Sequence, residues 1–205
     1  AIISVSESVF EPLLTNEVNV NGTLNILMAA KEEGIKRVVF ASSSAIYDDN
    51  YEYPHVEDKN ILPYSSPYAA SKYIGELYCK LFFRLYNLET VSLRYFNVYG
   101  PRQDPNGEYA AVIPKFITEI MNKRAPVIYG DGKQTRDFIF VKDVVRANLQ
   151  ACRREGVSSE AFNIGQGNNT SVEELLKNIK ELMDSDIKHE HKDKRPGDVR
   201  YSIAD

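Results

Sequence analysis

The sequence contains no tryptophan and only two cysteines, Cys79 and Cys152, which are far apart and lack CxxC spacing. A disulfide-bonded scaffold is therefore not expected, and a reducing, cytoplasmic location is predicted. No apolar run approaches the ~20 residues of a membrane-spanning helix, so no membrane partner is expected. Neither sign of charge is in large excess, because 25 basic and 29 acidic side chains leave a net charge of −4. Such a chain has no overall field for nucleic acid, and any phosphate must be bound by a local cluster.

Several motifs of known enzyme classes are also missing. The sequence has no GxSxG, HExxH or GxxxxGK[ST] segment. His189 and His191 form an HxH pair, but no cysteine lies near them, so no zinc site is expected. The chain starts at Ala1 without a methionine or signal peptide and ends at Asp205 without a closing element. From this we expect it to be part of a longer protein.

The remaining composition is that of a globular protein, with 43% apolar and 26% charged residues in 205. This is enough for one sizeable core or two small ones. Apolar periodicity predicts helices over 12–33 and 67–86, the second capped by Ser66. Continuous apolar runs predict buried strands from residue 38 and over 90–96. Helices alternating with strands predict the α/β class and the back half of a parallel sheet.

The pattern changes after residue 100, where turn residues cluster and the predicted helices become shorter. The shorter elements are helices over 112–123 and 141–154, a strand over 161–164, and a helix that begins at a capping box of Thr170 or Ser171 with Glu174. We therefore predict a boundary near residue 96. Residues 1–96 would form one domain and 97–205 mainly a second, smaller α/β domain, with part of 138–154 packing back on the first.

Tyr68 and Lys72 have the i, i+4 spacing that places two side chains on one face of a helix. A tyrosine becomes a general base only when its pKa falls from ~10 toward 7, which takes about 4 kcal/mol. One ammonium at ~6 Å supplies roughly 3 kcal/mol at an effective dielectric of ~20. The pattern thus predicts that Lys72 lowers the pKa of Tyr68. An ordinary surface pair has the same spacing, and so does Tyr129–Lys133, where the intervening GDG predicts a turn.

Polar residues follow two of the predicted strands. Ser42, Ser43 and Ser44 come directly after the first, and Asn97 ends the second. Ligands of parallel sheets bind beyond the carboxyl ends of the strands, so these residues are candidates for a shared site. The alternatives are a polar strand exit and a turn asparagine.

Phosphate binding has two candidates in the second half of the chain, and a third residue could bind a ribose. Arg136 lies in GDGKQTRDF, and Arg195 opens RPGD, with Asp198 three residues later. One guanidinium group can bind two phosphate oxygens at once, and a carboxylate can accept hydrogen bonds from ribose hydroxyls. Solvated surface charges are the alternative for each arginine.

Taken together, six segments resemble one family in their order along the chain. They are ASSSAIY, SPYAASK, LRYFNVYGPRQDPNG, YAAVIPKF, GDGKQTRDFIFVKDV and RPGDVR. The family is that of the NAD-dependent epimerases/dehydratases, which are extended short-chain dehydrogenases/reductases, and the likeness is to its nucleotide-sugar 4-epimerases. The resemblance implies a doubly wound, Rossmann-like parallel sheet whose N-terminal part, with the glycine-rich dinucleotide loop, is missing from these residues. Residues 1–96 would then belong to a dinucleotide-binding domain and 97–205 mainly to a UDP-sugar-binding domain.

The resemblance also implies roles for individual residues. The catalytic positions are Tyr68, Lys72 and Ser43. The positions around the NAD cofactor are Asn19, Ser42, Tyr68, Lys72 and Tyr95. The substrate positions are Ser43, Ser44, Asn97, Val112, Tyr129, Arg136, Arg195, Asp198 and Ser202.

The implied reaction is inversion of C4 of a UDP-hexose through a transient 4-keto sugar, with enzyme-bound NAD. Ser44 and Ala45 stand where dehydratases and decarboxylases of the family carry a carboxylate, so epimerisation is favoured. A small residue at Ser202 is expected to admit UDP-GlcNAc and UDP-GalNAc beside UDP-Glc and UDP-Gal. The alternatives are a non-catalytic nucleotide-sugar-binding fragment and a UDP-glucuronate 4-epimerase. A homodimer through helices near 12–33 and 67–86 is also implied.

Overall fold

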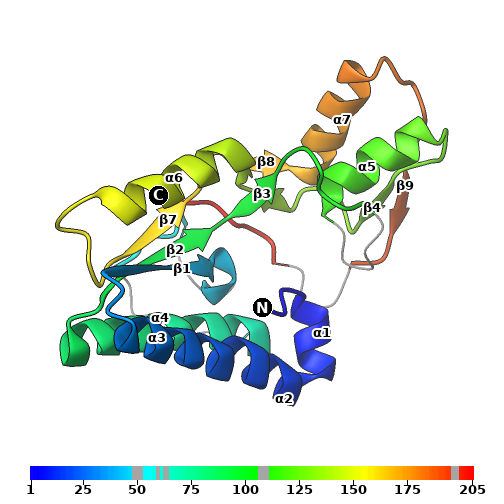
Figure 1. Cartoon of the computed structure of the whole chain (residues 1–205). Helices are drawn as coiled ribbons and strands as arrows, with labels where there is room; N and C mark the ends of the chain where they lie inside the picture. Colours follow the sequence, from blue (N-terminus) through cyan, green and yellow to red (C-terminus); the bar gives the residue numbers. More distant parts are fainter. Residues whose placement is uncertain (48–52, 59–60, 62–64, 106–110, 195–198) are drawn as a thin grey trace.

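The computed structural model describes residues 1–47, 53–58, 61, 65–105, 111–194 and 199–205. Its largest sheet has three parallel strands in the order β1 (Arg37–Ser43), β2 (Glu89–Tyr95) and β7 (Ala161–Ile164). Helices α3 (Gly22–Glu32) and α4 (Pro67–Tyr86) cover one face of this sheet, and α6 (Val141–Arg153) covers the other (Figure 1). The predicted α/β class with a parallel sheet is confirmed.

Helix α4 forms where the sequence predicts it, because both of its ends carry strong local signals. The Ser66 Oγ accepts a hydrogen bond from the Ala69 N–H at 3.1 Å, and Pro67 occupies the first turn. Asn87 ends the helix in the left-handed conformation, with φ of 56°. In the parallel register of β1 and β2, Ser43 lies beside Tyr95. The first turn of α4 lies at the same end of the sheet as these two residues.

The N-terminal helical segment differs from the predicted regular helix over 12–33. After α1 (Val5–Phe10), the chain forms α2 (Pro12–Thr15), a π-helical segment η1 (Asn16–Asn21) and then α3. The Asn19 amide lies in the π-helical segment and exchanges two hydrogen bonds with the backbone of Ile2, at 2.8 and 2.9 Å. The extent of the helix was thus predicted, but its π-helical centre was not. This centre coincides with the contact between Asn19 and Ile2, which helical periodicity does not reveal.

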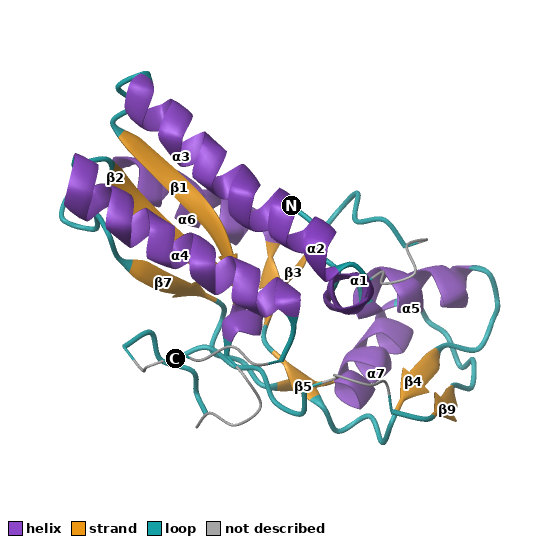
Figure 2. Ribbon diagram, turned by 90° about the horizontal axis from the view of Figure 1, so that it is seen from below, coloured by secondary structure: helices purple, strands orange, loops and turns teal. Residues whose placement is uncertain are grey.

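A smaller lobe lies at the other end of the molecule. Figure 2 shows α5 (Val112–Met121) and α7 (Val172–Leu182) beside the parallel pair β4 (Val127–Tyr129) and β9 (Glu190–Lys192). A separate apolar core holds these elements together, formed by Phe116, Ile120, Ile128, Val172, Leu176 and Ile179.

Short strands connect the lobe to the sheet. β3 (Asn97–Tyr99) pairs in parallel with β6 (Phe138–Phe140), and β5 (Thr135–Arg136) pairs antiparallel with β8 (Thr170–Ser171). A 3₁₀ turn, η2 (Ser44–Ile46), follows β1.

The chain returns to the large sheet after the first part of the lobe. α6 lies against the sheet, where Ala151 packs with Val91 and Leu93, and β7 adds to the open side of β2. The 161–164 strand therefore belongs to the same sheet as residues 37–43 and 89–95. The functional division at residue 96 stays a prediction.

Two expectations from composition concern cysteine and membranes. Both cysteines are free thiols, Cys79 buried and Cys152 exposed. In the ranges described above, no helix has the length and apolar character needed to cross a bilayer.

Candidate active site

The structure brings Tyr68, Ser43 and Lys72 together at the carboxyl end of β1. Tyr68 is buried in the first turn of α4, and its hydroxyl lies close enough to the Ser43 side chain to interact with it. Lys72 lies one turn further along α4, and its Nζ donates to the Ala41 carbonyl at 2.8 Å. The same Nζ lies 5.9 Å from the centroid of the Tyr68 ring. A phenol, a hydroxyl and an ammonium thus share one small region, as the sequence predicted for the catalytic set.

The electrostatics of this group differ from the prediction. Burial raises the pKa of Tyr68 above its usual value of 10, and the Ser43 side chain beside it offsets this only in part. Burial also lowers the pKa of Lys72. The chain without a cofactor therefore does not show the predicted fall of the Tyr68 pKa, because burial disfavours the phenolate.

Of the three other residues predicted near the cofactor, Asn19 and Ser42 contact α4, and Tyr95 does not. The Asn19 Nδ2 donates to Ser71 Oγ of α4 at 3.0 Å. The Ser42 hydroxyl donates to Glu76 Oε1 at 2.5 Å, beneath α4. Tyr95 points to the opposite face of the sheet, where its hydroxyl donates to Asn148 of α6 at 2.9 Å. The cofactor roles of these three residues stay predictions.

A buried ion pair lies directly behind the serine triplet. Arg94 Nη2 and Glu76 Oε2 are 2.8 Å apart, and their side chains are only 4% and 2% exposed. Arg94 also donates to the Tyr47 hydroxyl at 2.7 Å. Charged side chains are almost never this buried without a partner. The sequence carried a signal that we did not use, namely an arginine inside the apolar strand LRYF.

The predicted substrate residues are spread from the sheet to the lobe. Ser44 begins η2 and Asn97 begins β3. Val112 opens α5 and packs on the core of the lobe, while Tyr129 and Arg136 lie on β4 and β5.

The C-terminal candidates divide into two groups. Ser202 is buried in the final segment. Arg195 and Asp198 lie outside the described residues, so the predicted pair of arginines is represented by Arg136 alone.

The final segment is held by a residue that the sequence analysis missed. Asp137 is fully buried, and its carboxylate accepts backbone hydrogen bonds from Gln166, Gly167 and Ala204 at 2.8, 2.9 and 3.1 Å. A side chain on Gly165 would place a Cβ 2.5 Å from the carboxylate. Asp137 thereby joins the turn after β7 to the segment that carries Ser202.

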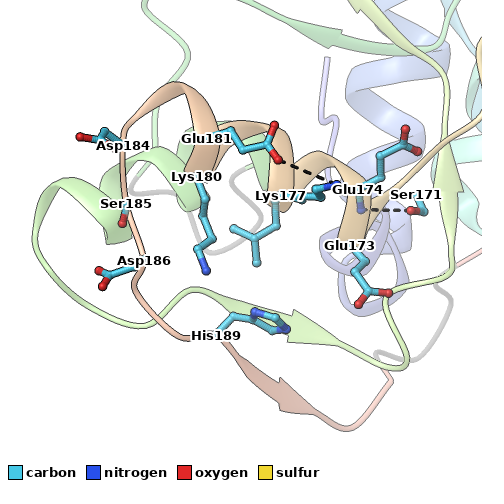
Figure 3. A pocket seen from close by; sticks show the side chains of 11 residues that line it. Ser171, Glu173, Glu174, Lys177, Lys180, Glu181, Asp184, Ser185, Asp186 and His189 are labelled. Carbon is cyan, nitrogen blue, oxygen red and sulfur yellow. Dashed lines mark hydrogen bonds and ion pairs between the residues drawn. The ribbon is translucent and has the colours of Figure 1, made fainter.

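A wide hollow elsewhere on the molecule contains none of the predicted site residues. Figure 3 shows that it lies between α7 and the chain leading to His189, with Lys177, Lys180 and Glu181 around it. Its lining is charged and open to solvent, and it lies in the lobe, away from Tyr68.

Comparisons with known proteins agree with this arrangement. Residues 1–165 match the model of the NAD dependent epimerase/dehydratase family. A putative UDP-glucose 4-epimerase of Methanocaldococcus jannaschii is 48% identical over 181 residues, which are 88% of this chain and 58% of that relative. The chain thus spans less than two thirds of the length of this relative.

Two solved structures are similar over the whole chain. The UDP-N-acetylglucosamine 4-epimerase of Methanobrevibacter ruminantium M1, in complex with UDP-N-acetylmuramic acid, is 47% identical with a TM-score of 0.96, and 65% of it is covered. The UDP-glucose 4-epimerase of Thermus thermophilus, in complex with NAD, is 37% identical with a TM-score of 0.88, and 67% of it is covered. The chain belongs to the NAD-dependent epimerase/dehydratase family.

Proposed function

We propose that the protein inverts C4 of a UDP-hexose through a transient 4-keto sugar, as a UDP-sugar 4-epimerase that uses bound NAD. The observation that carries this proposal is the grouping of Tyr68, Ser43 and Lys72 at one end of the sheet, with the Lys72 Nζ 5.9 Å from the centroid of the Tyr68 ring. The names of the similar proteins support it, since they include UDP-glucose and UDP-N-acetylglucosamine 4-epimerases. The large sheet would be the C-terminal part of a Rossmann-like, dinucleotide-binding domain, and residues 97–205 mainly a UDP-sugar-binding domain.

In this reaction Tyr68 and Ser43 handle the proton of the sugar 4-hydroxyl. The phenolate of Tyr68 accepts this proton, and the Ser43 hydroxyl beside it holds the sugar oxygen and relays the proton. After the sugar has turned within the site, Tyr68 returns the proton to the 4-oxygen. Both proton transfers thus use one side chain, which requires that Tyr68 stay in place while the sugar moves.

The residues around Tyr68 fit a nicotinamide cofactor. An ammonium has three donors, and among the described residues Lys72 uses one of them, on Ala41. Lys72 would hold the nicotinamide ribose, with Asn19, Ser42 and Tyr95 as the other proposed contacts. NAD supplies the acceptor and donor of the C4 hydride, and its positive charge would favour the phenolate of Tyr68.

The UDP end would be held by the lobe and the C-terminal segment. We assign the uracil to Val112 and Tyr129, the diphosphate to Arg136 and Arg195, and the ribose to Asp198. The sugar would lie near Ser44, Asn97 and Ser202. Because Ser202 is small, we include UDP-GlcNAc and UDP-GalNAc among the substrates.

Turnover of UDP-galactose to UDP-glucose by the protein of the complete gene tests the proposal, with UDP-GalNAc as the second substrate. Tyr68→Phe is expected to lower kcat by roughly 10²–10⁴-fold, because it removes the general base. UDP affinity, measured by calorimetry, is expected to stay unchanged. Tyr78→Phe on the same helix is the control and is expected to keep full activity. Binding of UDP without NAD, and without turnover, would instead favour the non-catalytic alternative.

We also propose a homodimer through α3 and α4. Ile26 of α3 and the stripe of Leu77, Leu81 and Leu85 along α4 are exposed apolar side chains. Side chains at i, i+4 and i+8 form one face of a helix, and the two helices lie side by side (Figure 2). Sedimentation equilibrium of the complete protein measures whether this face is covered by a second copy.

A further inference from the structure

Ser8 of α1 makes an unusual contact with the helix that carries Tyr68. It is fully buried, with 0% of its surface exposed. Its hydroxyl donates to the Val5 carbonyl at 2.6 Å and accepts a hydrogen bond from the backbone N–H of Tyr68 at 3.1 Å. A side chain 60 residues earlier in the chain therefore caps the N–H of the proposed catalytic residue itself.

This contact gives the backbone N–H of Tyr68 an acceptor that α4 itself does not provide. The first N–H groups of a helix have no partner within the helix. Pro67 has no backbone N–H group. The Ser66 hydroxyl already accepts a hydrogen bond from the Ala69 N–H. The Tyr68 N–H depends on Ser8, and without that hydroxyl it would be a buried donor without an acceptor, at a cost of about 1–3 kcal/mol.

The carbonyl side of Tyr68 is held from the same N-terminal segment. Ser71 Oγ donates to the Tyr68 carbonyl at 2.8 Å and accepts from Asn19 Nδ2 at 3.0 Å. The Asn19 amide is fixed in turn by the backbone of Ile2. Tyr68 is therefore held on both sides of its Cα by groups connected to residues 2–19.

We propose that Ser8 is a positioning residue for Tyr68, which keeps the phenol in place at the carboxyl end of β1 while the substrate turns over. This rests on the proposed epimerase function. The effect would reach the chemistry through the backbone of α4, since Ser8 bonds to the main chain and not to the phenol. Small displacements of a reacting group can lower a rate by about 10²-fold, so the effect should fall on kcat.

Ser8→Ala in the complete, NAD-loaded protein tests this proposal. We expect kcat for UDP-galactose to fall at least ten-fold, with KM changed by less than two-fold. The matched control is Ser171→Ala, which removes the side-chain cap of α7 in the lobe and should destabilise the protein to a similar extent. That control is expected to leave kcat unchanged. Ser8→Cys keeps the size of the side chain but accepts hydrogen bonds weakly, and serves in place of Ser8→Ala if the latter does not fold.

Amide hydrogen exchange gives a readout that does not depend on activity. In Ser8→Ala, the amides of Tyr68 and Ala69 should exchange at least ten-fold faster, with no such change in Ser171→Ala. Equal kcat and equal exchange in the two variants would overturn the positioning role. If the unmodified protein does not epimerise any UDP-hexose, the proposed function fails, and the exchange experiment still decides whether Ser8 holds the first turn of α4.

Discussion

At the scale of single residues, one physical cause shifts two pKa values in opposite directions. Burial raises the pKa of Tyr68 and lowers that of Lys72. In the chain alone, burial therefore disfavours both charged forms, the phenolate and the ammonium. A phenolate beside Lys72 at neutral pH needs a further positive charge, which the proposed site would gain from the nicotinamide ring.

Lys72→Met tests how much of the phenolate's stability comes from the ammonium. Removing a cation at ~6 Å costs the phenolate about 3 kcal/mol, which is roughly two pKa units. Because Tyr68 must be ionised to act, the acidic limb of the kcat profile should move upward by about two pH units. Activity at pH 7 should then fall by roughly 100-fold in the NAD-loaded protein. Lys80→Met, on the exposed side of the same helix, is expected to leave the profile unchanged, and an unshifted limb in Lys72→Met would contradict the electrostatic role.

The grouping of Tyr68, Lys72 and Ser43 could be predicted from the sequence because its geometry is local, while their catalytic role stays a prediction. The i, i+4 spacing of Tyr68 and Lys72 fixes their relation on a helix, and parallel strands fix which end of the sheet Ser43 occupies. The three acceptor contacts of Asp137 and the pair of Glu76 with Arg94 were not predicted. They depend on which distant segments meet, and no spacing in the sequence encodes this.

At the scale of secondary structure, α4 lies close against β1 because Gly75 has no side chain. A Cβ at this position would lie 2.3 Å from Cζ of Phe40. The Lys72 Nζ lies 5.3 Å from the centroid of the same ring. The distance between α4 and β1 therefore sets the position of the proposed catalytic lysine.

Gly75→Ala should force α4 away from β1. We expect the free energy of unfolding to fall by about 1–3 kcal/mol, as in other overpacked cores, and kcat to fall with it. Gly22→Ala is the control, since its added Cβ has no neighbour closer than 3.9 Å. Replacing that helical glycine should raise stability by roughly 0.5–1 kcal/mol. Urea unfolding of the two variants measures both changes, and equal stability of Gly75→Ala and the unmodified protein would refute the packing argument.

The elements themselves were easier to predict than their partners. The periodicity of residues 67–86 and the apolar run over 161–164 identify a helix and a strand. The same pattern does not reveal that residues 161–164 pair with β2, in the sheet formed by the first part of the chain. Nor does periodicity distinguish the π-helical turn around Asn19 from regular helix, because both keep an apolar face.

At the scale of the whole molecule, several buried acidic groups keep their protons because of the fold. Burial raises the pKa values of Tyr47, Tyr68 and Tyr95, and it raises the pKa of Cys79 to about 12. Each of these groups binds its proton more tightly in the folded chain than in the unfolded one. The stability that they contribute is complete below the pKa of the unfolded groups and is lost as the pH rises through the folded pKa.

The free energy of unfolding should therefore decrease between pH 8 and pH 11. Lys72, whose pKa is lowered, acts in the opposite direction, but it is one group against four. Urea unfolding at the two pH values measures the difference, and Tyr95→Phe should make the decrease smaller. A free energy of unfolding that stays constant or rises between pH 8 and pH 11 would contradict this prediction.

The position of β2 between β1 and β7 also governs how the chain can be made. Tyr95 pairs with Ile164, which is synthesised 69 residues later. At ribosomal speeds of ~5–20 residues per second, this interval lasts roughly 3–14 s. During that time the nascent chain must keep one side of an apolar strand unpaired, a state in which aggregation competes with folding. Chaperones that bind nascent chains should therefore engage this protein most strongly while its middle third emerges, and release it once residue 164 has left the exit tunnel.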